Sequence, residues 1–100
     1  MKTIRIGGGQ GFWGDLNDAP IVMAKQDEVN YIACDYLAEL TLSIMRRQQE
    51  KRPEAGYARD FITVIKQMLP SLKEKGTKVI TNAGGMNVKQ AVELVKQAIK

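Results

Sequence analysis

The sequence predicts an α/β protein built on a parallel β-sheet, and three observations lead to this fold class. Short apolar runs rich in β-branched residues occur at residues 3–6, 29–34 and 78–81. Amphipathic helical stretches lie between these runs and after the last one. Strands that alternate with helices form parallel sheets, because each return crossing needs a helix-length connection. We therefore expect a three-layer, Rossmann-like parallel sheet of three βα units, which forms a single domain over residues 1–100 or the N-terminal part of a larger domain.

The first unit starts with the strand Thr3–Ile6, which is expected to end at a glycine-rich loop over residues 7–16. A short helix is predicted from about Ala19 to Gln26. Asn17 is a good N-cap residue, and Pro20 suits a first helical turn.

The second unit starts with the strand Val29–Cys34, whose near-continuous apolar character is typical of a strand covered on both faces. Apolar residues then recur at helical spacing from Leu37 to Met45, and we expect this stripe to be buried. The helix runs into the charged segment RRQQEKRPE, after which Gly56 marks a connector.

The third unit starts with an amphipathic helix, with apolar residues from Phe61 to Leu72 and a stop at Gly76. Pro70 lies inside this pattern and predicts either a kink or a junction of two shorter helices. The strand at 78–81 follows, then the turn NAGGMN and a last helix capped by Asn87.

The composition excludes several classes of protein. The chain has 100 residues, of which 44% are hydrophobic and 26% charged, as in an ordinary globular domain. No apolar run approaches the roughly 18 residues of a membrane span, and the N-terminus lacks a signal-peptide core, so we expect a cytoplasmic protein with no membrane partner. There is no histidine and only one cysteine, Cys34. A disulfide within the chain and a histidine-based triad are therefore excluded, and Cys34 is expected in the core.

The formal net charge of +4 has one dense cluster, at Arg46, Arg47, Lys51 and Arg52. This cluster is either an anion-binding patch or the solvated end of a helix. Because no aromatic residues are interleaved for base stacking, we favour the solvated helix end and expect no nucleic-acid partner.

The glycine-rich loop matches a dinucleotide-binding pattern. Gly9, Gly11 and Gly14 fit G-x-G-x-x-G, and Asp35 ends the second strand where a ribose hydroxyl would be bound. The motif should open directly into a helix, however, whereas residues 15–18 intervene, and two aromatic residues occupy the place where a pyrophosphate needs close approach. We therefore favour another anionic ligand, bound through the loop amides, and keep a tight turn without a ligand as the alternative.

Ligands of parallel sheets bind outside the carboxyl ends of the strands. Three segments fall there, GGGQGFWGD, CDYLAE and TNAGG, and we expect them to converge. In the third, Asn82 offers a side-chain amide, and Gly84 and Gly85 allow close approach before the helix N-terminus at Asn87. An Asx-type turn with a helix cap is equally consistent with these residues.

Three carboxylates, Asp15, Asp35 and Glu39, lie at or just beyond the predicted strand ends. If they meet, they could coordinate a divalent cation or act as general acid and base. The alternative is helix capping and compensation of the helix dipole. Glu39 is the strongest candidate, because it lies in the first turn of a helix that starts at this edge.

These segments, in this order, resemble a known family. The runs IRIGGGQGFWGD, VNYIACDYLAELTL and KVITNAGGMN, with the Gly56–Tyr57 pair between the last two, are similar to the N-terminal part of the acyclic terpene utilisation (AtuA) family. The resemblance covers nearly the whole chain and implies an α/β protein of bacterial catabolism, in which terpenoids and other branched acids are degraded as coenzyme A thioesters. Members of that family are several times longer, so whether this chain is itself an enzyme stays open.

Two hypotheses follow. In the first, the chain is the N-terminal portion of such a catabolic protein and binds an anionic acyl substrate, or its coenzyme A thioester, at the carboxyl edge of the sheet. In the second, it is a non-catalytic nucleotide- or anion-binding module that assembles with a partner chain. No cofactor or metal is assigned, and we expect a homo-oligomer or assembly with the remainder of a larger protein. The predicted catalytic residues are Asp35 and Glu39, and the predicted ligand-binding residues are Gly8, Gly9, Gly11, Asp15, Asn82, Gly84, Gly85 and Asn87.

Overall fold

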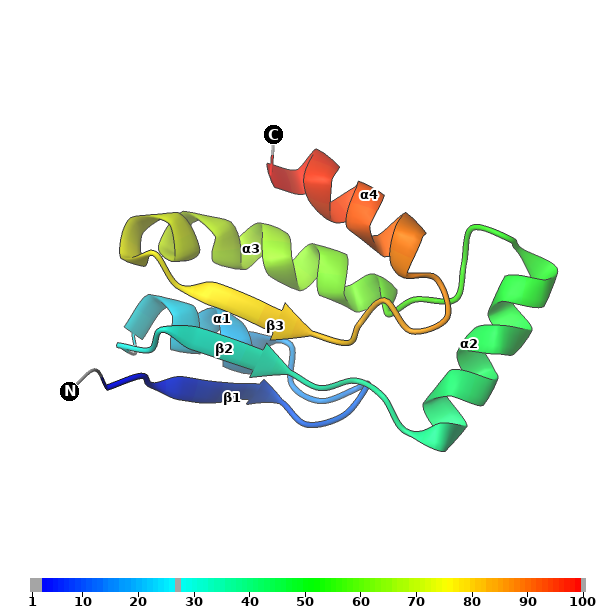
Figure 1. Cartoon of the computed structure of the whole chain (residues 1–100), viewed down its shortest axis with the longest axis horizontal. Helices are drawn as coiled ribbons and strands as arrows, with labels where there is room; N and C mark the ends of the chain where they lie inside the picture. The colour runs from blue at the N-terminus through cyan, green and yellow to red at the C-terminus, as the bar shows by residue number, and fades with distance from the viewer. Residues whose placement is uncertain (1–2, 27, 100) are drawn as a thin grey trace.

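A computed structural model describes residues 3–26 and 28–99, and these residues form an α/β fold around a three-stranded parallel sheet (Figure 1). The strands lie in the order β1 (Ile6–Gln10), β2 (Tyr31–Cys34) and β3 (Lys78–Thr81). The helices are α1 (Asp18–Gln26), α2 (Glu39–Lys51), α3 (Arg59–Lys75) and α4 (Val88–Ile99). The predicted α/β class and the parallel sheet are confirmed.

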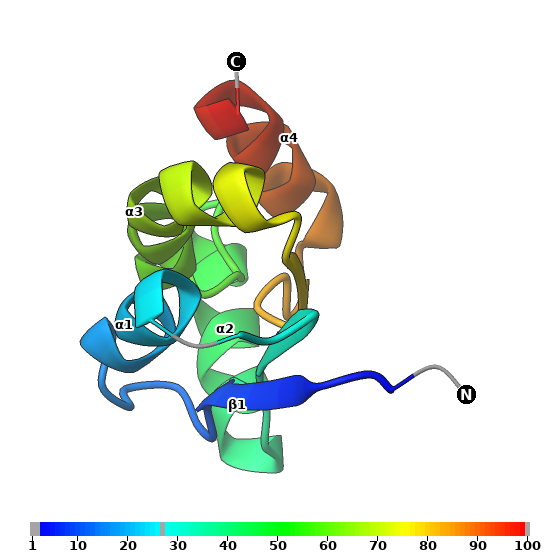
Figure 2. The ribbon, with the colours of Figure 1, turned by 90° about the vertical axis from the view of Figure 1, so that its left-hand side faces the viewer.

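One face of the sheet packs against helices. Gly7, Ile32 and Val79 are partners in the strand register and so share this face. A Cβ atom on Gly7 would meet Met23 of α1, and the side chain of Ile32 is fully buried. Figure 2 shows α1 and α3 together on this side of the strands, and the two helices pack on each other. The core therefore lies between the sheet and these two helices.

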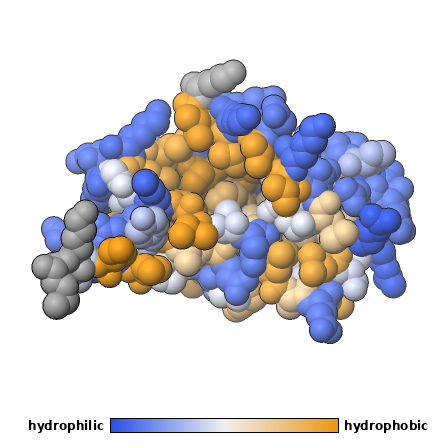
Figure 3. All heavy atoms as spheres, viewed as in Figure 1, coloured by the Kyte–Doolittle hydropathy of each residue, from blue (hydrophilic) through white to orange (hydrophobic). Residues whose placement is uncertain are grey.

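The opposite face of the sheet is uncovered in the described residues. Ile6 of β1 is 67% exposed and Ile80 of β3 is 58% exposed, while Tyr31 and Ala33 of β2 are only partly buried. Figure 3 looks onto this side and shows several apolar patches on it. The expectation that β2 is covered on both faces was wrong. In the part of the chain that the structure describes, helices pack on one face only, so the apolar residues Tyr31 and Ala33 stay partly exposed on the other.

The first strand differs most from its prediction. It was expected at Thr3–Ile6, but β1 runs from Ile6 to Gln10 and so contains Gly7, Gly8 and Gly9. Glycine is a poor strand former, yet α1 approaches β1 too closely for side chains at two of these positions. Tight packing against α1 therefore overrides the local preference.

The second helix was correctly predicted, but its environment was not. Figure 1 shows α2 beyond the carboxyl ends of the strands, and among its residues only Met45 is classed as buried. Leu40 is 72% exposed, and Ile44 is exposed as well. The expected burial of the whole apolar stripe is wrong, because a helix that lies off the end of the sheet meets the core along only part of its length.

The third unit follows its prediction closely. α3 is one continuous helix with Pro70 inside it, so two separate helices are excluded. It ends at Gly76, which adopts the left-handed conformation with φ of 69° and donates its N–H to the carbonyl of Leu72. β3 has the predicted bounds, and α4 begins after Asn87. No helix of the described residues is long and apolar enough to cross a membrane.

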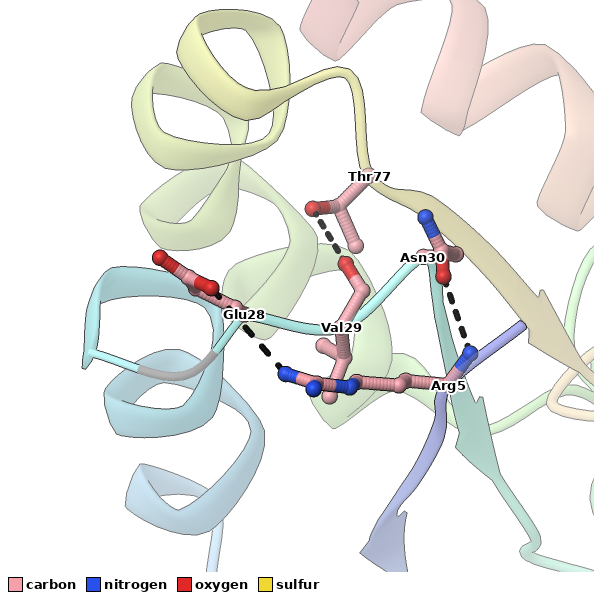
Figure 4. A network of polar contacts seen from close by, with 5 residues as sticks. All are labelled: Arg5, Glu28, Val29, Asn30 and Thr77. Carbon is pink, nitrogen blue, oxygen red and sulfur yellow. Dashed lines mark hydrogen bonds and ion pairs between the residues drawn. The ribbon is translucent and has the colours of Figure 1, made fainter. Parts of the chain in front are cut away.

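The amino ends of the three strands are tied together by polar contacts (Figure 4). The N–H of Arg5 donates to Asn30 Oδ1 at 2.9 Å, and Thr77 Oγ1 donates to the carbonyl of Val29 at 3.1 Å. The Arg5 guanidinium also lies 4.0 Å from the exposed carboxylate of Glu28. These contacts fix the entry into each strand.

Candidate functional site

The carboxyl ends of the three strands converge, as their parallel arrangement predicts. The N–H of Asp35, after β2, donates to the carbonyl of Gln10 in β1 at 2.9 Å. The side chain of Asn82, after β3, accepts the N–H of Tyr36 at 2.8 Å and donates to Asp35 Oδ1 at 2.9 Å. We call Gln10, Asp35, Tyr36 and Asn82 the strand-end cluster.

A buried pair within the strand-end cluster was not found from the sequence. Tyr36 is fully buried, and its hydroxyl donates to Gln10 Oε1. Gln10, only 5% exposed, donates through Nε2 to Asn17 Oδ1 at 3.1 Å and to the carbonyl of Asp15 at 3.3 Å. Burial raises the pKa of Tyr36, so the phenol stays protonated and serves as a donor. This pair joins the loop after β1 to the end of β2.

Asp15 binds amides of its own loop. Its Oδ2 accepts the N–H of Gly11 at 2.9 Å, and its Oδ1 accepts the N–H of Leu16 at 2.8 Å. The Gly11 amide, followed by that of Leu16, holds the pKa of the Asp15 carboxyl below its usual value. A carboxylate of the protein therefore occupies the position at Gly11 where the sequence suggested an external anion.

The other two glycines predicted to bind a ligand through this loop are part of β1. A Cβ atom on Gly9 would lie 2.9 Å from Cβ of Pro20 and 3.0 Å from Cγ2 of Ile32, so α1 packs directly onto this residue. A Cβ atom on Gly8 would meet nothing within 4 Å, because Gly8 lies on the uncovered face. Their expected place in a loop was wrong.

The turn over residues 82–87, which follows β3, is held from behind by the connector that precedes α3. Asn87 Nδ2 donates to the carbonyls of Pro53 and Ala55, at 3.1 Å and 2.9 Å. Gly85 has φ of 52°, and a Cβ atom there would lie 2.9 Å from the carbonyl oxygen of Gly56. The predicted cap is confirmed, since Asn87 Oδ1 accepts the N–H of Gln90 at 3.3 Å.

The same turn presents backbone donors. The N–H groups of Gly84, Val88 and Lys89 have no acceptor among residues 3–26 and 28–99. Two of them belong to the first turn of α4, where the helix itself supplies no acceptor. The positive end of the helix dipole lies at the same place. Free N–H groups at a helix N-terminus are suited to a carboxylate or phosphate oxygen.

Glu39 lies apart from the strand-end cluster. It begins α2 and is exposed, and its carbonyl accepts the Ser43 hydroxyl at 3.2 Å, while its carboxylate makes no hydrogen bond or ion pair within residues 3–26 and 28–99. Within the part of the chain that the structure describes, no three carboxylate or cysteine side chains gather as metal ligands would. Asp15, Asp35 and Glu39 therefore do not form the cation site that was one alternative for them.

Large apolar side chains are exposed along the same end of the molecule. Phe12 and Leu16 come from the loop after β1, Leu40 from the start of α2, and Met86 and Val88 from the turn after β3. Each connection after a strand thus carries at least one exposed apolar residue beside the polar strand-end cluster. Such a combination suits a ligand with both a polar and an apolar part.

Cys34, at the end of β2, is buried with a free thiol. Burial raises the pKa of this thiol to about 11, so it stays protonated and is a weak nucleophile. The prediction that Cys34 belongs to the core is confirmed.

A family model described as acyclic terpene utilisation family protein AtuA matches residues 4–100, and this range includes all three strand-end segments. No curated protein and no solved structure matches the chain.

Proposed function

Since the chain belongs to the acyclic terpene utilisation family AtuA, we propose that it binds the anionic end of a branched acyl compound, free or as a coenzyme A thioester, at the carboxyl ends of its strands. The observation that carries this proposal is the set of unpaired backbone donors in the turn after β3. The N–H groups of Gly84, Val88 and Lys89 follow Asn82 of the strand-end cluster in the sequence and have no acceptor in the described residues.

The anionic end of the ligand would be bound by these donors. A carboxylate or phosphate oxygen that accepts backbone N–H groups at a helix N-terminus gains from the helix dipole as well as from the hydrogen bonds. The cation of Lys89 adds to the positive potential at this turn. The loop after β1 is a weaker candidate, because Asp15 already accepts the amide of Gly11.

The acyl part would lie on the exposed apolar side chains of the same edge. Met86 belongs to the turn after β3, Val88 begins α4, and Phe12 and Leu16 follow β1. An apolar chain that covers them removes their surface from water, at about 25 cal/mol for each Å² buried. A neutral, polar compound of the same size gains from neither the donors nor this surface.

Asp35 is our candidate for acid or base chemistry. Its Oδ1 accepts bonds from Asn82 Nδ2 and from the N–H of Leu37 at 3.2 Å, which orients the carboxylate. Its Oδ2 has no partner in the described residues, so it is free to accept a proton from a bound acyl group. Glu39, on α2, would act only if a substrate spanned the distance between the two segments.

The donor at Val88 can be removed without disturbing the helix. Val88 is the first residue of α4, and proline is favoured at that position because its missing N–H has no helical acceptor. Val88→Pro therefore deletes one donor. Val88→Ala keeps the donor and is the matched control, since both variants lose the valine side chain.

The test is calorimetric titration of both variants with geranate, a branched acyl carboxylate. We expect Val88→Pro to bind at least tenfold more weakly than Val88→Ala, because a hydrogen bond to a charged group contributes about 1.5–3 kcal/mol. Equal affinity of the two variants would contradict a role for the α4 N-terminus. Binding of NAD or ATP without binding of geranate or geranyl-coenzyme A would favour the nucleotide-binding module instead.

The role of Asp35 is tested separately. Asp35→Asn keeps the acceptor for Asn82 but removes the base, so we expect geranate binding to be retained and turnover of the acyl thioester by the protein to fall by at least a hundredfold. Undiminished turnover would remove Asp35 from the mechanism.

A further inference from the structure

A furrow runs beside β3, between α3 and α4, and one end of it reaches the turn after β3, where Asn82, Gly84 and Gly85 line it. A cavity of about 410 Å³ is lined by apolar residues of both helices and by Val79 of β3. A second cavity, of about 360 Å³, continues it toward the end of α4 and shares Ile65, Val79 and Val95 with the first. We infer that this furrow is the binding site of a fourth β-strand. The strand is supplied by an extended peptide segment with alternating apolar residues and an acidic residue at one end.

The backbone of β3 is the first reason. β3 pairs with β2 from Lys78 to Thr81 and has no strand on its other side in the described residues. Its outward N–H and C=O groups are therefore a template for another strand. An extended peptide that adds to such an edge gains main-chain hydrogen bonds, and alternate side chains fill pockets beside it.

The position of α4 is the second reason. α4 packs mainly on α3, and packed helices lie 8–10 Å apart, whereas neighbouring strands lie about 4.8 Å apart. Because α4 stands beside α3, it therefore extends past β3, the last strand of the sheet. Figure 3 shows the result as an apolar hollow between α4 and the sheet, open toward the viewer. A strand beside β3 would cover this hollow and bury Val92, which is now exposed.

A second copy of this chain fits the furrow less well than a single peptide does. Pairing β3 with β3 of another copy would bring that copy's α3 and α4 under the same edge. The space there is already taken by α4, which flanks the furrow along its length. A segment without helices of its own meets no such obstacle.

The charged residues of the furrow indicate which kind of residue the peptide carries at one end. The charged residues that line the two cavities are Lys73 and Lys96, and no carboxylate lines either of them. Lys73 lies in the last turn of α3 and Lys96 in the last turn of α4. Two cations in a furrow that no carboxylate lines favour an acidic residue on the peptide.

The test uses a labelled peptide and the wild-type chain. The peptide DVTVTV, acetylated and amidated, carries one acidic residue and an apolar face, and its binding is followed by fluorescence anisotropy. We expect an analogue that is N-methylated at alternate residues to bind at least tenfold more weakly, because it cannot pair with β3. We also expect slower amide exchange at residues 78–81 when DVTVTV is bound. Equal binding of the N-methylated analogue, or unchanged exchange, would overturn the proposal.

A charge exchange tests the acidic end. In the double variant Lys73→Glu with Lys96→Glu, we expect weaker binding of DVTVTV and stronger binding of KVTVTV, with circular dichroism confirming the fold. Loss of both peptides from a folded variant would contradict the assigned charge. A dimer in sedimentation that peptide dissociates would show that a second copy occupies the edge, and would overturn the assignment to a single segment.

Discussion

The two glycine-rich segments of this chain use glycine for different purposes. In the first, Gly7 and Gly9 let α1 lie directly on β1, and the carboxylate of Asp15 takes the Gly11 amide. In the second, the turn after β3 is held from behind by the connector, and N–H groups of Gly84 and of the start of α4 have no acceptor in the part of the chain that the structure describes. The segment that looks more like a nucleotide-binding motif in the sequence is thus the one in which packing explains two glycines, Gly7 and Gly9.

This difference is instructive about motifs. A run of glycines means that backbone is approached closely, but the approaching group can belong to the protein itself. Within the G-x-G-x-x-G match, Gly9 lies in β1 against α1, and Gly11 donates its amide to Asp15. The less distinctive NAGG turn keeps donors available, and its position at a strand end and a helix start carries more information than its composition.

The largest expected effect tests the packing role of the first segment. Gly9→Val places a side chain against Pro20 and Ile32, where even a Cβ atom would lie within about 3.0 Å of both. We expect a loss of about 3 kcal/mol in the free energy of unfolding, measured by urea denaturation. Gly8→Val, on the same strand but on the open face, is the control and should change stability by less than about 0.5 kcal/mol. Similar losses in both variants would mean that α1 does not set the need for glycine.

The next effect tests the second segment. Gly85→Ala would strain a left-handed residue and press a Cβ atom against the carbonyl of Gly56, so we expect a loss of about 2 kcal/mol. Gly76→Ala is the control, because Gly76 is also left-handed, with φ of 69°, but a Cβ atom there meets nothing within 4 Å. Its loss should be about 1 kcal/mol, from strain alone. An equal loss of stability in Gly76→Ala would show that the contact with the connector does not contribute to the effect of Gly85→Ala.

The smallest effect tests the carboxylate within the first segment. The pKa of Asp15 is lowered from 3.8 in the folded chain, so its contribution to stability is present above pH 3.8 and is lost as the pH falls through the lower, folded value. Asp15→Asn should therefore be slightly less stable than wild type at pH 7, and the difference should shrink below pH 3.8. Glu54→Gln, at an exposed position in the connector, serves as a control. A difference that grows in acid would contradict the hydrogen bonds to Gly11 and Leu16.

Much of the fold follows from pattern alone. The helical spacing from Phe61 to Leu72 and the glycine at 76 gave α3, and the short apolar runs gave β2 and β3 to within two residues. Strand and helix alternation also predicted that the segments after the strands would converge, as Asp35 and Asn82 do, because parallel strands share one carboxyl edge. Local signals are sufficient where a residue's own preference and its tertiary surroundings agree.

The failures occur where tertiary packing decides. The stretch Gly7–Gly9 has no side chains to show a strand period, so the sequence offers nothing to place β1 there. Leu40 and Ile44 have helical spacing but lie off the end of the sheet, which periodicity cannot show. The Gln10–Tyr36 contact joins side chains 26 residues apart, and a single buried glutamine after a glycine run carries no pattern of its own.

The packing of α2 on the rest of the molecule has a consequence for local unfolding. α2 contacts the rest of the molecule through Met45, which lies against Gly85, and through Gln49, which lies against Gly56 and donates to the carbonyl of Met86 at 3.2 Å. Because few of its side chains are buried, α2 can detach as a local unit, at a lower free energy than the melting of the sheet. Because both anchors end on the turn after β3, each such opening loosens that turn, and the two segments will exchange their amide hydrogens together.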